Sequence, residues 1–152
     1  FSAVNTQLNS SNLGFHVISK YLGANLITIN ETEMRHELRN KTEDRISLIK
    51  TLSKKLRSNY TNVTSGEMGS IIYNSSTNEI LRCPAFADKV RDKVGTGDSM
   101  LAILAISLYK KFDVKFSMFL SALVAAENIQ YMANKMSITK SNITRAVQSY
   151  LK

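Results

Sequence analysis

The chain has 152 residues, 43% of them apolar, and a formal charge of +8 at neutral pH. This length and apolar content allow one sizeable hydrophobic core, so we expect a single domain over residues 1–152. No apolar run reaches the length that spans a bilayer, and no stacking aromatic platform for nucleic acid is recognisable, so the sequence predicts neither a membrane nor a nucleic-acid partner. The positive charge suits a partner that carries phosphate groups.

The cysteine content and the start of the sequence indicate the redox compartment of the protein and whether the chain is a piece of a longer one. Cys83 is the only cysteine in the sequence, which excludes an intramolecular disulfide and favours a reducing cytoplasm. The sequence shows no signal-peptide pattern and begins at Phe1 rather than at a methionine. We therefore expect a cytoplasmic protein and an excised or processed piece of a longer chain.

Short apolar and β-branched runs bounded by turn-forming residues predict the strands. They are residues 1–4, 26–29, 60–63, 70–73 and 79–83. The last two runs flank a polar turn and predict a β-hairpin. Helical spacing of apolar residues predicts the helices. They are residues 13–21, 42–56 with Thr42 as N-cap, 98–111, 115–132, and a last helix capped by Thr139 or Ser141. Strands that alternate with helices predict an α/β fold with three layers and a mostly parallel sheet.

A glycine-rich turn directly before the 98–111 helix is the main candidate for a functional site. Gly95, Thr96 and Gly97 precede Asp98. Glycines let backbone N–H groups converge on an anion, and the N-terminus of the next helix directs its unpaired N–H groups to the same place. Asp98 would then be close enough to take a proton from an attacking hydroxyl. The alternative is that Asp98 only caps the helix, and these residues alone leave both possibilities open.

Residues 92–98, DKVGTGD, resemble the second signature of the ribokinase-like (PfkB) carbohydrate kinases, usually D-x-x-G-A-G-D. In that family the last aspartate is the catalytic base, and the Gly-x-Gly amides form an anion hole for the transferred phosphoryl group. The resemblance therefore implies that Asp98 is the base and that Gly95, Thr96 and Gly97 form the anion hole.

The first half of the same signature would lie beside the nucleotide. The resemblance implies that Asp92 and Lys93 take part in binding it. Many relatives bind a monovalent cation beside this loop, and the ammonium group of Lys93 could replace the charge of that ion. The alternative for Lys93 is an exposed loop residue.

Two further motifs follow in the order of the family. Asn30 and Glu33 match its N-x-x-E motif, which implies magnesium and phosphate handling by oxygen ligands. Thr64, Gly66 and Gly69 match T-x-G-x-x-G, a turn that packs against the nucleotide in the family. The alternatives are a helix N-terminal carboxylate that offsets the helix dipole and a plain turn between strands.

The resemblance implies ATP and Mg²⁺ as cofactors, and transfer of phosphate from ATP to a hydroxyl of a sugar or sugar phosphate. It covers the carboxyl-terminal, nucleotide-binding part of the family, so we expect that the amino-terminal sugar-binding half is absent. We therefore expect a partial ribokinase-like fold, weak binding of ATP or ADP, little turnover by the fragment alone, and an exposed sheet edge where two copies could pair. The stretch up to Arg35 is most similar to the kinase domain of bifunctional heptose-phosphate kinase/nucleotidyltransferases.

Two other classes of function remain as alternatives. A non-catalytic nucleotide-binding or regulatory module could keep the kinase fold, although such a module has no need of a base at Asp98. A basic nucleic-acid-binding domain would fit the charge, but the sequence offers no recognition motif for it.

Overall fold

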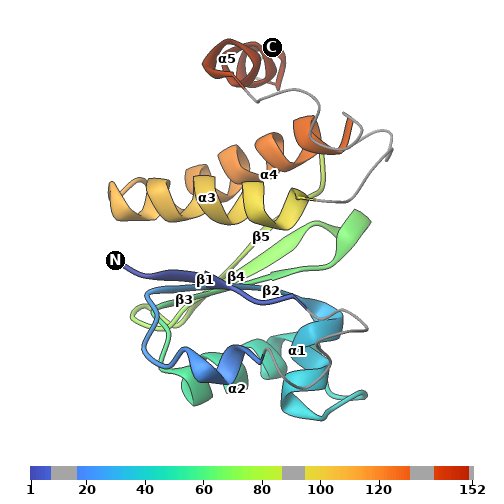
Figure 1. The fold of residues 1–152 in the computed structure, drawn as a ribbon, viewed down its shortest axis with the longest axis vertical. Coiled ribbons are helices and arrows are strands. Elements are labelled where there is room, and N and C mark those ends of the chain that lie inside the picture. Colours follow the sequence, from blue (N-terminus) through green and yellow to red (C-terminus); the bar gives the residue numbers. More distant parts are fainter. Residues whose placement is uncertain (8–16, 87–94, 131–138, 151–152) are drawn as a thin grey trace. The chain divides into compact units, whose positions relative to one another are not determined.

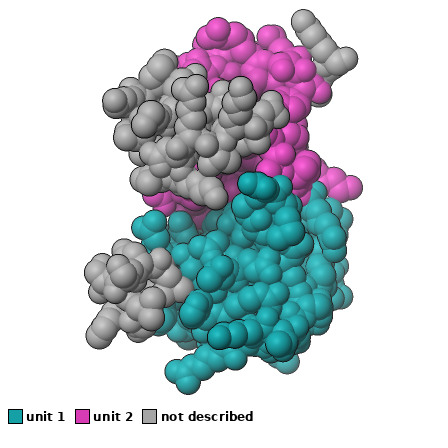
Figure 2. Space-filling model, turned by 90° about the vertical axis from the view of Figure 1, so that its right-hand side faces the viewer, with its two compact units in different colours: residues 1–82 teal, residues 83–152 magenta. Residues whose placement is uncertain are grey.

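A computed structural model of the chain describes residues 1–7, 17–86, 95–130 and 139–150. The chain forms two compact units, residues 1–82 and residues 83–152 (Figure 2). That the whole chain is one functional domain stays a prediction.

The first unit is built on a five-stranded sheet with the order β1-β2-β3-β4-β5 (Figure 1). The strands are β1 (Ala3–Asn5), β2 (Leu26–Asn30), β3 (Tyr60–Thr64), β4 (Ser70–Asn74) and β5 (Glu79–Cys83). β1, β2 and β3 run parallel, and β4 runs antiparallel to β3. A short turn joins the neighbouring strands β4 and β5 as a hairpin. The α/β class, the five strands and the hairpin are confirmed, and the sheet is mixed.

Helices α1 (Glu31–Leu38) and α2 (Arg45–Leu56) cover one face of this sheet (Figure 1). Alternate strand residues face them, because successive side chains of a strand point to opposite faces. The resulting core contains Ile27, Ile29, Val63, Met34, Leu48, Ile49, Leu52 and Leu56, all almost inaccessible to solvent. Each buried aliphatic side chain of this size contributes about 1.5–3 kcal/mol.

The start of α2 differs from the prediction. Its N-cap is Asp44, whose Oδ1 accepts hydrogen bonds from the N–H groups of Ile46 (2.8 Å) and Ser47 (3.1 Å). Thr42 lies two residues earlier in an exposed turn, where its N–H group donates to Asn40 Oδ1 at 3.2 Å. The prediction of Thr42 as the cap is therefore wrong.

The predicted helix over residues 13–21 falls mostly outside the described residues. Its described end is a short 3₁₀ turn, η1 (Ile18–Lys20), and Gly23 follows with a φ of 76°. A second 3₁₀ turn, η2 (Gly66–Met68), lies between β3 and β4.

The second unit holds the helices α3 (Thr96–Tyr109), α4 (Val114–Gln130) and α5 (Lys140–Tyr150). Helices α3 and α4 pack side by side after a short connection (Figure 1). Thr139 Oγ1 accepts the N–H group of Asn142 at 3.3 Å, so Thr139, rather than Ser141, caps α5. Across the described residues, no helix has the length and apolar content needed to cross a membrane.

Candidate active site

Helix α3 begins on a glycine that has no side-chain cap. Gly95 is the N-cap with a φ of 77°, a left-handed conformation that glycine adopts without steric cost, and no side-chain hydrogen bond caps the helix there. Asp98 lies in the first turn and is exposed. The alternative in which Asp98 is the N-cap is therefore wrong. The carboxylate instead lies at a helix end whose dipole favours negative charge.

The hydroxyl of Thr96 adds a second polar group at the same turn. Within the part of the chain that the structure describes, Thr96 Oγ1 is buried and has no hydrogen-bond partner. A hydroxyl can donate one hydrogen bond and accept two, and leaving it unpaired costs free energy. An anion bound at the start of α3 would satisfy this group together with the backbone N–H groups of the first turn.

Asn30 and Glu33 form a capping box at the carboxyl end of β2. Asn30 Oδ1 accepts the N–H group of Glu33 at 2.8 Å, and Glu33 Oε2 accepts the N–H group of Asn30 at 3.0 Å. Both residues predicted to handle metal thus have a structural role at the N-terminus of α1.

The same geometry tests whether Mg²⁺ fits these residues. The described residues contain no group of three His, Cys, Asp or Glu side chains that could enclose a metal ion. Asn30 and Glu33 offer oxygen atoms that already accept backbone hydrogen bonds. This donor set fits an ion that keeps most of its own water and is contacted through it, as Mg²⁺ usually does.

The loop after β3 lies beside Asn30. Thr64, the last residue of β3, is the register partner of Asn30, the last residue of β2. The loop then closes on itself, because Ser65 N–H donates to Gly69 O at 2.8 Å and Gly69 N–H donates to Gly66 O at 3.0 Å. Gly66 and Gly69 both have positive φ angles, 57° and 79°. The structure therefore brings two of the three predicted motifs together at one edge of the sheet.

A polar network that the sequence analysis missed supports this loop. Ser65 Oγ donates to Glu31 Oε2 at 2.9 Å and accepts a hydrogen bond of 2.7 Å from Arg45 Nη1. Glu31 Oε1 also accepts two hydrogen bonds from Arg35, at 2.8 and 3.1 Å. The four-residue spacing of Glu31 and Arg35 is a recognisable helical ion pair, whereas no local pattern could have found the contacts of Ser65.

Neighbouring positive charges and hydrogen bonds keep the carboxyl group of Glu31 ionised at neutral pH. Burial by itself would raise the pKa of this carboxyl group. The hydrogen bonds from Arg35 and Ser65 and the charges of Arg45 and Arg35 outweigh burial and lower the pKa below its ordinary value. At neutral pH the side chain of Glu31 is therefore negatively charged when it accepts the hydrogen bond from Ser65 Oγ.

The sheet face opposite α1 and α2 carries buried polar atoms in the middle of β2 and β3 and at the start of β4. Among the described residues, Thr28 Oγ1, both side-chain polar atoms of Asn62, and Ser70 Oγ are buried without a partner. Thr28 and Asn62 are register partners on neighbouring strands. Water or a polar ligand would satisfy these groups. The sequence analysis did not single them out, because alternate polar residues in a strand usually face solvent.

The predicted site residues divide between the two units. Asn30, Glu33 and the Thr64–Gly69 loop belong to the first unit, and Gly95–Asp98 belong to the second. Asp92 and Lys93 lie outside the described residues. That all three motifs gather around one nucleotide stays a prediction.

Comparison with known proteins identifies the family. The pattern of the pfkB family carbohydrate kinases matches residues 3–140. The chain belongs to this family of carbohydrate kinases.

Particular relatives agree with this assignment. The bifunctional protein HldE of Campylobacter fetus is 34% identical over 111 residues, which cover 71% of this chain and 24% of that protein. HldE of Helicobacter pylori is 36% identical over 101 residues, covering 64% of this chain and 21% of that protein. The chain thus spans about a quarter of the length of these curated relatives.

The fold is also similar to that of a solved ribokinase-like enzyme. Phosphofructokinase-2 of Escherichia coli superposes with a TM-score of 0.74 at 11% identity, over 88% of this chain and 43% of that chain. This likeness confirms a partial ribokinase-like fold.

Proposed function

We propose that the chain carries the nucleotide-binding and catalytic-base part of an enzyme that transfers phosphate from ATP to a hydroxyl of a sugar or sugar phosphate. The observation that carries the proposal is the start of α3. There the N-cap Gly95, the exposed Asp98 and Thr96 Oγ1, which has no partner among the described residues, lie within one turn. Membership of the pfkB family makes phosphoryl transfer the reaction that this arrangement suits.

Asp98 is the proposed base of this reaction. Its carboxylate takes the proton of the acceptor hydroxyl while the hydroxyl oxygen forms a bond to the γ-phosphorus of ATP. The bond from the γ-phosphorus to the bridging oxygen breaks, and ADP leaves with that oxygen. The backbone N–H groups of Gly95, Thr96 and Gly97, together with the helix dipole, stabilise the charge on the transferred group.

The first unit supplies the proposed nucleotide contacts. Thr64, Gly66 and Gly69 would hold the nucleotide through a loop whose backbone can approach phosphates closely. Asp92 and Lys93, in the second unit, are the further residues expected to bind the nucleotide. Asn30 and Glu33 would contact Mg²⁺ through water, and the bound ion would neutralise phosphate charge.

The second candidate is a nucleotide-binding module without catalysis. It shares every nucleotide contact above, and it differs only in giving Asp98 no chemical role. The exposed position of the carboxylate in the first turn of α3 favours the enzyme. Turnover by these 152 residues alone is expected to be slow, because the chain spans less than half of the kinases that share its fold.

Calorimetric titration with ATP and Mg²⁺ tests the proposal. The protein should release or take up heat on binding ATP, and ADP should compete. Thr96→Val, which removes the hydroxyl but keeps the side-chain shape, should weaken binding. Thr51→Val, at an exposed position on α2, is the matched control and should bind as the wild type does. The absence of any heat above the buffer signal at millimolar nucleotide would contradict the proposed function.

A further inference from the structure

A side-chain relay joins α4 to the first turn of α3 within the second unit. Asn128 Nδ2 donates a hydrogen bond of 3.1 Å to Ser99 Oγ. Ser99 Oγ in turn donates to the carbonyl oxygen of Gly95 at 3.0 Å. The backbone N–H group of Ser99 also donates to this oxygen, at 3.0 Å. Asn128 on α4 is thus linked through Ser99 to Gly95, the N-cap of α3.

The donor at each step follows from the number of hydrogens available. The hydroxyl of Ser99 has one hydrogen, and its bond to Gly95 O uses it. Ser99 Oγ can then only accept from Asn128. The carboxamide must therefore present its NH₂ group to Ser99, which fixes the orientation of the Asn128 side chain.

Burial of the Asn128 side chain costs free energy unless its amide group forms a hydrogen bond. It is 6% exposed, and it follows the buried apolar segment 122–126 of the same helix. A buried amide without a hydrogen bond costs free energy, whereas an apolar side chain of the same size would not. Its pairing with Ser99 is therefore the property that distinguishes Asn128 from the neighbouring buried residues.

We propose that Asn128 is a positioning residue for the anion hole at the start of α3, an inference that rests on the proposed function. The carbonyl group of Gly95 and the N–H group of Thr96 belong to the same planar peptide unit and point in opposite directions. Holding Gly95 O through Ser99 therefore also fixes the direction of the Thr96 N–H group, one of the proposed donors to the phosphoryl group. Pre-set donors stabilise a developing charge better than donors that must first reorient.

The test breaks this chain of hydrogen bonds at each of its two side chains in turn. Asn128→Leu replaces the amide by an apolar side chain of similar size, and Ser99→Ala removes the hydroxyl. Each should raise the dissociation constant for ATP with Mg²⁺ by about three- to tenfold, while the unfolding midpoint of Asn128→Leu stays equal to or above that of the wild type. The double variant should bind no more weakly than Ser99→Ala alone, because the two residues act through one contact.

Ser121→Ala is the matched control. Ser121 is also buried on α4, but its hydroxyl donates to Met118 O within the same helix, at 2.9 Å. Its replacement should leave ATP binding unchanged.

Amide hydrogen exchange separates this inference from the proposed function. The Ser99 N–H group, which donates to Gly95 O, should exchange about tenfold faster in Asn128→Leu than in the wild type, with or without nucleotide, and should not change in Ser121→Ala. Unchanged exchange of the backbone N–H group at position 99 in both Asn128→Leu and Ser99→Ala would overturn the positioning role, even if the wild type binds ATP. Faster exchange in a protein that binds no ATP would support the relay and count against the proposed function instead. If Asn128→Leu fails to fold, Ser99→Ala decides by the same measurement.

Discussion

Arg45 Nη1 donates a hydrogen bond of 2.7 Å to Ser65 Oγ, and this bond ties the first residue of α2 to the loop that follows β3. Glu31 completes the contact from α1, because its Oε2 accepts from Ser65 and lies 3.4 Å from Arg45 Nη1. The loop that carries Gly66 and Gly69 is thus attached to both helices of the first unit. Since this loop is the proposed nucleotide contact, the attachment should influence nucleotide affinity.

Arg45→Ala should loosen the loop and weaken ATP binding several-fold. Arg45 and Glu31 are each 24% exposed as side chains, so their contact is screened less than a surface pair. We expect a loss of about 1 kcal/mol in the free energy of unfolding, since a hydrogen bond between partly buried charged and polar groups disappears. Urea titration and calorimetry with ATP measure the two effects.

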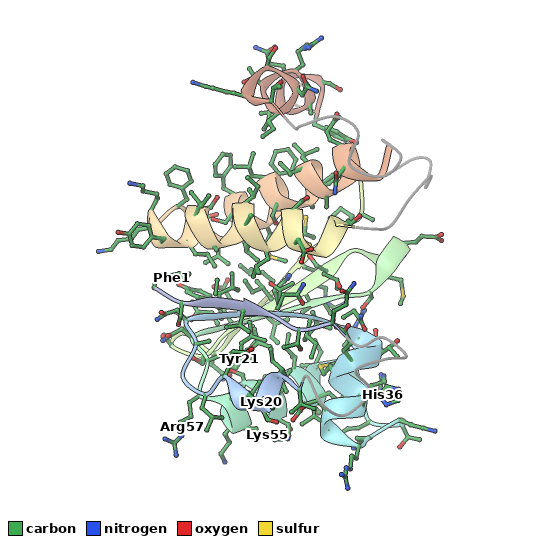
Figure 3. The ribbon with its side chains drawn as sticks, in the orientation of Figure 1. Phe1, Lys20, Tyr21, His36, Lys55 and Arg57 are labelled. Atoms are coloured by element: carbon green, nitrogen blue, oxygen red, sulfur yellow. The ribbon has the colours of Figure 1, made fainter. Side chains whose placement is uncertain are left out.

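Lys55→Ala is the control for this change. Lys55, labelled in Figure 3, forms the ion pair of the last turn of α2 with Glu37, at 2.6 Å, and its side chain is 43% exposed. Its removal leaves the Glu37 carboxylate, 8% exposed, without this partner and should also cost about 1 kcal/mol of stability, but it should leave ATP binding unchanged. An equal loss of affinity in Lys55→Ala would show that the effect of Arg45→Ala is not local to the loop.

Glu31→Gln should alter how stability depends on pH. The pKa of Glu31 lies below its ordinary value of 4.5 in the folded protein, because the hydrogen bonds and charges of Arg35, Ser65 and Arg45 outweigh the effect of burial. Its ionised form therefore stabilises the fold fully above the unfolded pKa, and this contribution is lost as the pH falls through the folded pKa. Glutamine keeps the shape but cannot ionise. The difference in unfolding free energy between wild type and Glu31→Gln should be largest near neutral pH and vanish in acid. A difference that does not change with pH would contradict a lowered pKa of Glu31.

Strand positions were predictable from the sequence, and the reason is local. Each strand is a short apolar or β-branched run between turn-forming residues, and the structure places all five within two residues of the predicted bounds. The start of α2 was harder, because Thr42 and Asp44 are both good N-caps. The choice between them depends on which residues pack into the core, and sequence spacing alone does not settle that.

The candidate site was predictable only in part for a related reason. Asn30 and Thr64 end neighbouring parallel strands, so their adjacency follows from the fold. The contact of Arg45 with Ser65 joins residues 20 positions apart, and that of Ser99 with Asn128 joins residues 29 apart. Both contacts depend on how helices pack, and no local sequence pattern records them.

The N-cap of α2 gives a direct test of the observed helix start. Asp44→Ala should lower the unfolding midpoint by about 2–4 °C, because two N–H groups of the first turn lose their acceptor. Thr42→Ala should leave the midpoint unchanged, since Thr42 is exposed and lies outside the helix. Thermal unfolding followed by circular dichroism measures both. A larger effect for Thr42→Ala than for Asp44→Ala would place the cap where the sequence first suggested it.

Asp98→Asn is the most direct test of the proposed chemistry. Asparagine keeps the size of the side chain and its position in the first turn of α3, but it cannot take a proton from the acceptor hydroxyl. In the complete enzyme, assayed with a panel of sugars and sugar phosphates, kcat should fall at least about 100-fold, the lower range for loss of a general base. The KM for ATP should change little, because the anion-hole amides remain.

Asp113→Asn provides the matched control for this last variant. Asp113 lies in the same unit and is exposed, and its Oδ1 accepts the N–H group of Phe116 at 3.0 Å at the start of α4. Asparagine is an equally good cap, so both stability and turnover should stay at wild-type values. Normal turnover in Asp98→Asn would show that another group takes the proton and would overturn the role of Asp98 as the base. Binding of ATP without any turnover by the unaltered complete protein would instead favour the non-catalytic nucleotide-binding module.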